Sequence, residues 1–300
     1  MVLFLVLAHT MAFAQGVSLD LRCVSDDVGT KICLPAIPKR IVSLAPNLTE
    51  TVFFLGANKK LIGRTARCNR PPAAANVPQI GAYLRPDLER IISLQPDLVL
   101  ATKPGLREEI VERLTALNIP VFVEDCRSID DVCSLLQRLG CLLGQEETAA
   151  IAIKDIQARR ITLHARLHGL DRPSVLFAVG VKPLVVAGGK SFLGALIREA
   201  GGINIAEHTP VPYSRYSFEE VIRKDPEYIL ILDKECKQQE CVDYLKRYAA
   251  LSAVQDHKVV SLDADLVARP APGAIDALEL IAKTIHADAY KLNKAASKER

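Results

Sequence analysis

A tyrosine and a glutamate six positions apart occur twice in this sequence, as Tyr83 with Glu89 and as Tyr213 with Glu219. The segments around them align without a gap at an offset of 130 residues, and each copy contains a proline before a short apolar run. A glutamate near the start of a helix favours the helix dipole, and the proline ends the helix and sends the chain into the next strand. Helix stabilisation would explain one such glutamate. Because the glutamate recurs at matching positions, we expect both copies to have a function beyond helix stabilisation. The repeat also predicts two similar lobes.

Short β-branched runs alternate with helical stretches in both halves of the chain, which is typical of α/β folds with parallel-rich sheets. The pattern predicts strands over 40–44, 98–101, 121–123, 174–177, 228–232 and 258–261, and helices over 48–55, 106–117, 129–143, 192–200, 244–248 and 274–290. Residues 145–168 contain no glycine or proline and predict one long helix between the halves. The expected organisation is an N-terminal α/β lobe over 15–144, the connector helix, a C-terminal α/β lobe over 169–290 and a basic tail over 291–300.

The first fourteen residues are apolar and end in Ala-Phe-Ala, the small-x-small pattern that signal peptidase cleaves. We therefore expect a signal peptide over 1–14 and an exported chain. The residues before Cys23, Leu21 and Arg22, are not those of a lipobox, so a free periplasmic protein is expected rather than a lipid-anchored one. No later run has the roughly 18 to 20 consecutive apolar residues of a membrane-spanning helix.

Eight cysteines, an even number, favour disulfides in an exported chain because an oxidising compartment preserves them. Cys23 and Cys33 flank a segment with two aspartates and Gly29, whose turn chemistry predicts a hairpin that would bring the two thiols together. Cys236 and Cys241 are a second candidate pair around a small loop. The partners of the other four cysteines are left open.

Composition excludes some functions and allows others. With 300 residues, 49% hydrophobic and 24% charged, the chain can bury a large core in one or two domains. Its net charge of +3 is too weak a bias to indicate nucleic-acid binding. The sequence has no G-x-S-x-G motif, and its six histidines do not recur at strand ends, so neither a hydrolase nor a zinc or manganese receptor is expected. We expect no catalytic residue and no resident metal or cofactor.

The string from Pro38 to Gly56, PKRIVSLAPNLTETVFFLG, resembles the opening of the class III periplasmic binding proteins, which are the cobalamin and iron-siderophore receptors of ABC importers. Further segments that match lie at 71–72, 87–91, 95–99, 188–191, 199–204 and 269–272. Among the branches of this family the chain is most similar to the vitamin B12-binding one. The resemblance implies two lobes joined by a single rigid helix, with the ligand in a cleft between them.

The resemblance also implies roles for individual residues. Glu89 and Glu219 match the glutamates that dock with arginines of the dimeric permease. One carboxylate per lobe suits a two-fold symmetric partner, and arginine pairs with a carboxylate through its planar fork. The positions that match the ligand contacts of the family are Tyr83, Thr102, Lys103, Tyr213 and Asp265. We accordingly expect a monomeric carrier, not an enzyme, that passes cobalamin or a related corrinoid to a permease.

Departures from the B12-binding pattern leave alternatives for the ligand. The chain has no tryptophan, and Arg67 and Gly273 stand where such receptors often have a tyrosine and an arginine. An iron-siderophore or haem receptor of the same fold is the main alternative, because Tyr83, Tyr213 and His208 offer axial iron ligands. A non-transport surface sensor built on the same two lobes is a further alternative.

Overall fold

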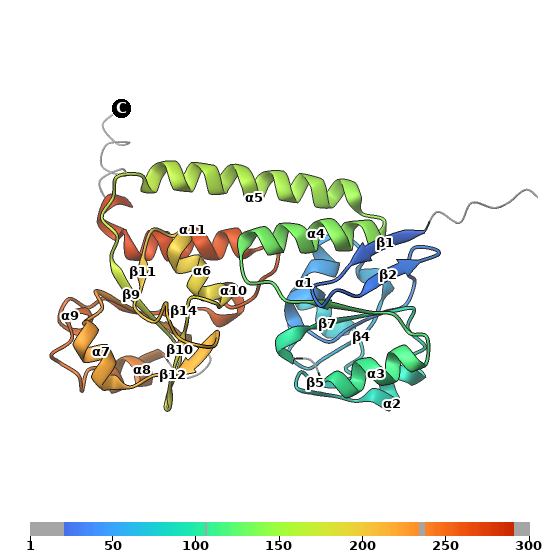
Figure 1. Ribbon diagram of the computed structural model, residues 1–300, viewed down its shortest axis with the longest axis horizontal. Coiled ribbons are helices and arrows are strands. Elements are labelled where there is room, and N and C mark those ends of the chain that lie inside the picture. Colours follow the sequence, from blue (N-terminus) through green and yellow to red (C-terminus); the bar gives the residue numbers. More distant parts are fainter. Residues whose placement is uncertain (1–20, 106, 234–237, 291–300) are drawn as a thin grey trace, which may run out of the picture.

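The computed structural model of the protein describes residues 21–105, 107–233 and 238–290. Two α/β lobes lie side by side below one long helix, α5 (Glu146–Leu167), which connects them (Figure 1). The predicted fold class is confirmed, and the predicted connector helix over 145–168 agrees with α5 to within one residue at each end.

The N-terminal lobe is built on a four-stranded parallel sheet in the order β4-β3-β7-β8. Its strands are β3 (Ile41–Ser43), β4 (Leu61–Arg64), β7 (Leu98–Thr102) and β8 (Val121–Glu124). Its helices are α1 (Pro46–Phe54), α2 (Leu88–Ser93), α3 (Glu108–Ala116) and α4 (Ile129–Leu143). Side chains from α1 and α4 cover one face of the sheet, and side chains from α2 and α3 cover the other. Burial on both faces explains why the strands are continuous apolar runs.

The C-terminal lobe has a six-stranded mixed sheet in the order β12-β10-β9-β13-β14, with β11 paired to the start of β9. Its strands are β9 (Ser174–Val181), β10 (Leu184–Ala187), β11 (Ile203–Asn204), β12 (Tyr213–Arg215), β13 (Tyr228–Leu232) and β14 (Val259–Leu262). Its helices are α6 (Phe192–Glu199), α7 (Phe218–Lys224), α8 (Gln238–Leu245), α9 (Ser252–Gln255), α10 (Ala264–Val267) and α11 (Ala274–Ile285). Strands β10 and β12 are antiparallel to their neighbours, and the other pairings are parallel.

The repeat seen in the sequence is also a repeat in backbone conformation. Gln95 and Asp225, which are 130 positions apart, both follow their helix in the left-handed region, with φ of 44° and 38°. This conformation is uncommon for residues other than glycine. In each lobe it precedes a proline and turns the chain from α2 or α7 into the central strand β7 or β13. The two lobes therefore have the same left-handed residue at equivalent positions between helix and strand.

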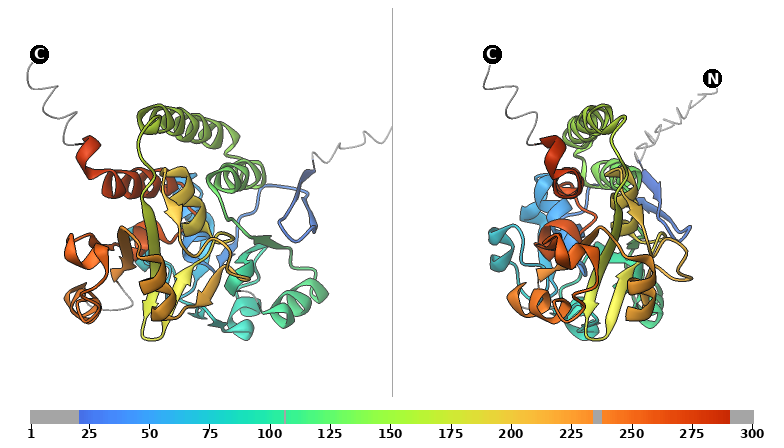
Figure 2. Two further views of the ribbon diagram at one scale, coloured as in Figure 1. Left: turned by 60° about the vertical axis from the view of Figure 1, so that its left-hand side comes forward. Right: turned by 90° about the vertical axis from the view of Figure 1, so that its left-hand side faces the viewer.

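Helices α4, α5 and α11 form an apolar layer that belongs to both lobes. Helix α5 contacts α4 of the N-terminal lobe and α11 of the C-terminal lobe, and these two helices also contact each other beneath it (Figure 1). The turned views keep α5 above both (Figure 2). The buried side chains of α5 form one stripe, Ala149, Ala152, Ile156 and Leu163, while its other faces meet solvent. A single hydrophobic core thus runs from one lobe into the other.

Gly144 makes the sharp reversal from α4 to α5 possible. It ends α4 in the left-handed region, with φ of 68°, the usual conformation for a glycine after a helix. A Cβ at this position would lie 2.4 Å from Ile37, so the close packing of the preceding loop also requires glycine.

A disulfide hairpin precedes the first lobe. Strands β1 (Arg22–Ser25) and β2 (Lys31–Leu34) pair so that Cys23 and Cys33 face each other, and the two cysteines form a disulfide, as the sequence predicts. Cys68, Cys126, Cys133 and Cys141 are free thiols.

The turn of this hairpin covers the open edge of the N-terminal sheet. Asp27 N donates to Val123 O of the edge strand β8 at 3.0 Å, and Val123 N donates to Asp26 Oδ2 at 3.2 Å. Arg138 of α4 holds Asp27 from above at 2.7 Å. Unpaired groups on an edge strand otherwise invite pairing with another chain. The hairpin thus replaces a missing strand.

Several expectations about local structure are corrected. The helix predicted over 244–248 is α8, which starts at Gln238 and ends at Leu245. The prediction placed the start too late because the polar first turn lacks the apolar periodicity of a buried helix. The helix predicted over 274–290 is interrupted: α11 ends at Ile285, residue 286 forms a turn in which the His286 ring bonds to Ala200 O at 2.9 Å, and residues 287–290 are helical again. Tyr213, which lies outside the predicted strands, begins strand β12.

Other expectations fall outside the described residues. These are the signal peptide over 1–14, the basic tail over 291–300 and the Cys236–Cys241 bridge. Within the described part of the chain no helix is both long and apolar enough to cross a membrane.

The hairpin disulfide is expected to stabilise the protein. Replacing both cysteines, Cys23→Ser with Cys33→Ser, should lower the free energy of unfolding by about 2–4 kcal/mol, because the open hairpin has more conformations in the unfolded chain. Urea denaturation under non-reducing conditions measures this, with Cys133→Ser as the control that removes a free thiol. Equal midpoints for the double variant and the native protein would contradict the expectation.

Candidate functional site

Tyr83 lies in the turn between the short strands β5 (Gly81–Ala82) and β6 (Arg85–Pro86) of the N-terminal lobe. Its ring is partly buried against the apolar core. Gly105, in the 3₁₀ turn that follows β7, lies directly against the ring, since a Cβ there would be 2.5 Å from Tyr83 Cζ. The absence of a side chain at position 105 therefore allows the segment after β7 to support the aromatic ring.

Tyr213 is the matching residue of the C-terminal lobe. It begins β12, and 45% of its surface is exposed. Burial nevertheless raises the pKa of its hydroxyl. An exposed surface and a pKa raised by burial occur together when protein surrounds a side chain on several sides but solvent still reaches it.

The two tyrosines lie within electrostatic range of each other across the lobes. Burial is the largest cause that raises the pKa of Tyr83, followed by Glu124, Cys68 and Tyr213, and the pKa reaches about 12. Tyr213 comes from the other lobe, so two residues that the sequence pairs 130 positions apart influence each other electrostatically. At neutral pH the Tyr83 hydroxyl is protonated.

Thr102 and Lys103, two other predicted ligand residues, adjoin this tyrosine. Thr102 ends β7 and is buried, and Lys103 begins the turn that contains Gly105. Lys103 Nζ forms an ion pair with Asp125 Oδ2 at 3.4 Å, although half of its side chain remains exposed. The positive charge of Lys103 is therefore already partly balanced within the N-terminal lobe.

Asp265, the last predicted ligand residue, belongs to a polar network that joins the lobes. Its carboxylate accepts hydrogen bonds from Arg269 and, at 3.1 Å, from Asn69 Nδ2 of the N-terminal lobe. Arg269 also bonds to Glu50 of α1, and its Nη2 donates to Asn69 Oδ1 at 2.7 Å. Only 11% of the Arg269 side chain is exposed. The network therefore fixes the two lobes to each other beside the candidate site.

Sequence reasoning missed most of this network. A second link joins Arg70 to Asp263 at 3.2 Å, and Asn47 Nδ2 reaches Pro270 O at 3.4 Å. Burial raises the pKa of Glu50 more than its bond to Arg269 lowers it. The sequence carried one signal for this pair, since Glu50 lies inside one motif of the family and Arg269 begins another. Their contact joins residues 219 positions apart and therefore leaves no local sequence pattern.

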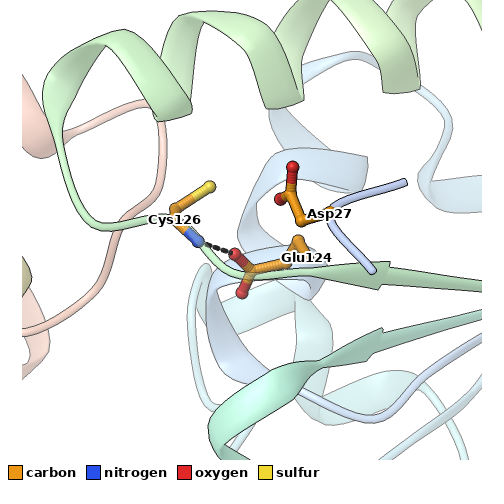
Figure 3. A group of neighbouring side chains, drawn as sticks. All are labelled: Asp27, Glu124 and Cys126. Atoms are coloured by element: carbon orange, nitrogen blue, oxygen red, sulfur yellow. Dashed lines mark hydrogen bonds between the residues drawn. The ribbon is translucent and has the colours of Figure 1, made fainter. Parts of the chain in front are cut away.

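An acidic group forms at the hairpin edge of the N-terminal lobe, where the exposed Asp27 and the buried Glu124 and Cys126 offer ligand atoms within 4.8 Å of one another (Figure 3). These atoms already have partners. Asp27 is held by Arg138, and Glu124 accepts from Asn47 Nδ2 and Cys126 N, each at 2.7 Å. Burial and then Glu124 raise the pKa of the Cys126 thiol, so it stays protonated. The group links the hairpin, β8 and α1, and we assign no metal to it.

Glu89 and Glu219 lie in the first turns of α2 and α7, as predicted. The side chains of Asp87 and Ser217 cap these helices, so the glutamates are not needed as caps. Both are exposed, and neither has an ion pair or hydrogen bond to any described residue, whereas the adjacent Glu220 is paired with an arginine one turn on. Helices α2 and α7 lie on the same side of the molecule, opposite α5 (Figure 1).

Comparison with known proteins assigns the family. The sequence profile described as periplasmic binding protein matches residues 41–266. The chain belongs to this family. The vitamin B12-binding protein of Pectobacterium carotovorum subsp. carotovorum (strain PC1) is 31% identical over 198 residues, which cover 65% of this chain and 72% of that protein.

Two solved structures of this family have similar folds. The periplasmic vitamin B12 binding protein BtuF of Vibrio cholerae has a TM-score of 0.76 at 25% identity, over 85% of this chain and 99% of that one. The periplasmic heme-binding protein RhuT from Roseiflexus sp. RS-1 has a TM-score of 0.76 at 26% identity, over 84% and 99%. The fold is therefore shared by proteins named for two different ligands.

The raised pKa of Tyr83 can be measured directly. An ultraviolet difference titration of the native protein against Tyr83→Phe should show one phenol with a midpoint of about 12. Because an unfolded tyrosine titrates near 10, this group contributes stability that is complete below about pH 10 and is lost as the pH rises towards 12. Glu124→Gln removes a nearby negative charge and should lower the midpoint. A midpoint near 10 in the native protein would contradict the buried position of the hydroxyl.

Proposed function

We propose that this protein captures cobalamin or a related corrinoid in the periplasm and delivers it to the dimeric permease of an ABC importer. The observation that carries the proposal is that Tyr83 and Tyr213, at matching places in the two lobes, are near enough for Tyr213 to contribute to the raised pKa of Tyr83. Aromatic faces suit a flat macrocycle, because they bury a large apolar area at small cost in side-chain entropy. Thr102, Lys103 and Asp265 would supply polar contacts at the edge of the ligand.

Delivery is supported by two glutamates that have no ion pair or hydrogen bond with any described residue. Glu89 and Glu219 are carried on helices that lie on one side of the molecule, so both carboxylates are available to a single partner. The shared layer of α4, α5 and α11 holds their separation constant. Two fixed charges define a register on a two-fold symmetric surface and increase the rate of encounter.

Haem is the second candidate ligand. The similarity to RhuT supports it, and Tyr83 and Tyr213 offer oxygen ligands for iron. Relatives such as the protein of Pectobacterium carotovorum are named for vitamin B12, and for this reason we place the corrinoid before haem and ferric siderophores.

The remaining parts of the proposal concern the form of the protein. We propose that the predicted leader over 1–14 exports the chain and that it acts as a monomeric carrier in the periplasm. Membership of a family of binding proteins supports a role without catalysis.

Ligand identity can be tested by titration calorimetry of the mature chain with cyanocobalamin, haemin and a ferric hydroxamate siderophore. We expect cyanocobalamin to saturate one site. Tyr83→Ala and Tyr213→Ala should each weaken binding by about 10- to 100-fold, the equivalent of one buried aromatic side chain. Tyr290→Ala, on the opposite side of the molecule, is the control. No response to cyanocobalamin together with saturation by haemin would overturn the corrinoid assignment.

Delivery can be tested separately. Glu89→Gln with Glu219→Gln should abolish or strongly reduce ligand uptake by cells while calorimetry shows unchanged ligand affinity, because the glutamates lie outside the tyrosine site. Glu147→Gln is a matched control, since Glu147 is an exposed residue in the first turn of α5 on the other side of the molecule. Unchanged uptake in the double variant, with ligand binding intact, would rule out the importer role and favour a surface sensor.

A further inference from the structure

Arg269 of the C-terminal lobe is shared among three groups, two of which belong to the N-terminal lobe. Its guanidinium bonds to Glu50 of α1 and to Asp265 of α10, and its Nη2 donates to Asn69 Oδ1 at 2.7 Å. Asn69 Nδ2 in turn donates to Asp265 Oδ2 at 3.1 Å. Only 11% of the Arg269 side chain and 14% of the Asp265 side chain are exposed, so little water competes for these bonds. These four residues form an interlobe clasp.

Asn69, the part of the clasp that lies on a loop, ends a compact turn of the N-terminal lobe. Cys68 N donates to Thr65 O at 3.1 Å, and the Thr65 hydroxyl lies 3.2 Å from Cys68 Sγ. Both Thr65 and Cys68 are fully buried, so the inner side of the turn is packed against the lobe. A bond that holds Asn69 therefore also holds the turn that precedes it.

The same turn is bonded to the strand that leads into Tyr83. Ala66 N donates to Gly81 O of β5 at 2.9 Å, and β5 ends directly before the tyrosine. Burial is the largest cause of the raised pKa of Tyr83, and Cys68 also contributes to it, which places the turn within electrostatic range of the hydroxyl. Arg269 is therefore linked to Tyr83 through this turn and β5.

We infer that Arg269 is a positioning residue for the ligand site, which fixes the Tyr83 turn of the opposite lobe by holding Asn69. This inference rests on the proposed capture of a ligand by Tyr83 and Tyr213. Arginine suits the role because its planar fork presents several donors at once, whereas the compact ammonium of lysine does not match three acceptors in this arrangement. The same bonds orient the carboxylate of Asp265, since each of its oxygens accepts one of them.

Preorganisation of this kind has a kinetic signature. Without the clasp the Tyr83 turn has several positions, and only a fraction of the molecules are competent to bind. The apparent affinity and the association rate both fall by that fraction, whereas the dissociation rate of the bound ligand changes little. Loss of a direct ligand contact has a different signature, because it mainly raises the dissociation rate.

The test follows cyanocobalamin binding to the mature chain by stopped-flow quenching of tyrosine fluorescence, which suits a protein without tryptophan. Asn69→Ala and Arg269→Lys should each slow association by about 3- to 10-fold and leave dissociation within about twofold of the native rate. Asn69→Ala removes an exposed amide and keeps Arg269 bonded to Glu50 and Asp265. It therefore carries the test if Arg269→Lys does not fold.

Arg159→Lys is the matched control. Arg159 also bonds to two carboxylates, with its Nη2 at 2.6 Å from Asp276 Oδ1 and at 2.7 Å from Glu279 Oε2. It belongs to α5, which lies on the side of the molecule opposite β5 and β12 (Figure 1). Its replacement should leave both rate constants of cyanocobalamin binding at their native values.

A second measurement needs no ligand. The ultraviolet titration of Tyr83, with an expected native midpoint of about 12, should move towards the ordinary value in Asn69→Ala, because a loosened turn lets water reach the hydroxyl. Arg159→Lys should not move it. A clasp that only stabilised the fold would lower the unfolding midpoint without changing the Tyr83 titration or the association rate.

Native association rates in both clasp variants, or an equal slowing in Arg159→Lys, would overturn the positioning role alone. Faster dissociation with unchanged association would also overturn it, since Asn69 or Arg269 would then contact the ligand directly. If the native protein binds haemin instead of cyanocobalamin, the same comparison with haemin decides the role of Arg269 separately from the identity of the ligand. Absence of binding by both would overturn the proposed capture together with this inference.

Discussion

The apolar layer formed by α4, α5 and α11 is the constraint on which the rest of the structure depends. A connector helix exposed on all sides would let the lobes swing, but here its buried stripe packs on one helix from each lobe. Moving one lobe would expose side chains that are now fully buried, such as Leu139 and Leu278. The spacing between Tyr83 and Tyr213, and that between α2 and α7, therefore follow from core packing. Motion between the lobes is limited accordingly.

Acidic residues fall into two classes that the fold keeps apart. Glu50 and Asp265 are engaged by Arg269 near the lobe interface, and Glu124 is bound by Asn47 and a backbone amide. These carboxylates have lost water and gained partners, so they organise the protein itself. Glu89 and Glu219 keep their water and have no partner among the described residues. Only carboxylates of the second class retain their full interaction capacity for another molecule.

Much of the fold could be predicted from the sequence because its signals are local. The connector helix, the central strands and the cross-strand cysteines follow from periodicity, from the absence of glycine and proline over 145–168, and from turn residues within ten positions. The repeated glutamates could be placed at helix starts because a proline follows each at a fixed distance. The left-handed residues Gln95 and Asp225 carried no such signal, since neither is glycine or asparagine.

What the sequence did not predict depends on long-range contacts. Strand β12 is held by pairing with β10, so its three residues look like a loop when read alone. Arg269 can bond to Glu50 only when both lobes are folded. Glu124 accepts a hydrogen bond from Asn47 and raises the pKa of Tyr83, and both of these residues lie in other elements. Candidate site residues were recognisable by type and by repetition, whereas the partners that fix their charge and orientation could be seen only in three dimensions.

The single passage of the chain through α5 has a consequence for biogenesis. Each lobe is one continuous stretch of the chain, and among the described residues every strand of each sheet comes from its own half. The disulfide closes a loop of ten residues at the start of the N-terminal lobe, and the edge of that lobe's sheet is covered by the same hairpin. If the chain crosses the membrane with its N-terminus first, the first lobe can thus fold and cap its own edge before the second lobe has emerged. The second lobe then needs only to dock α11 against a surface that is already in place.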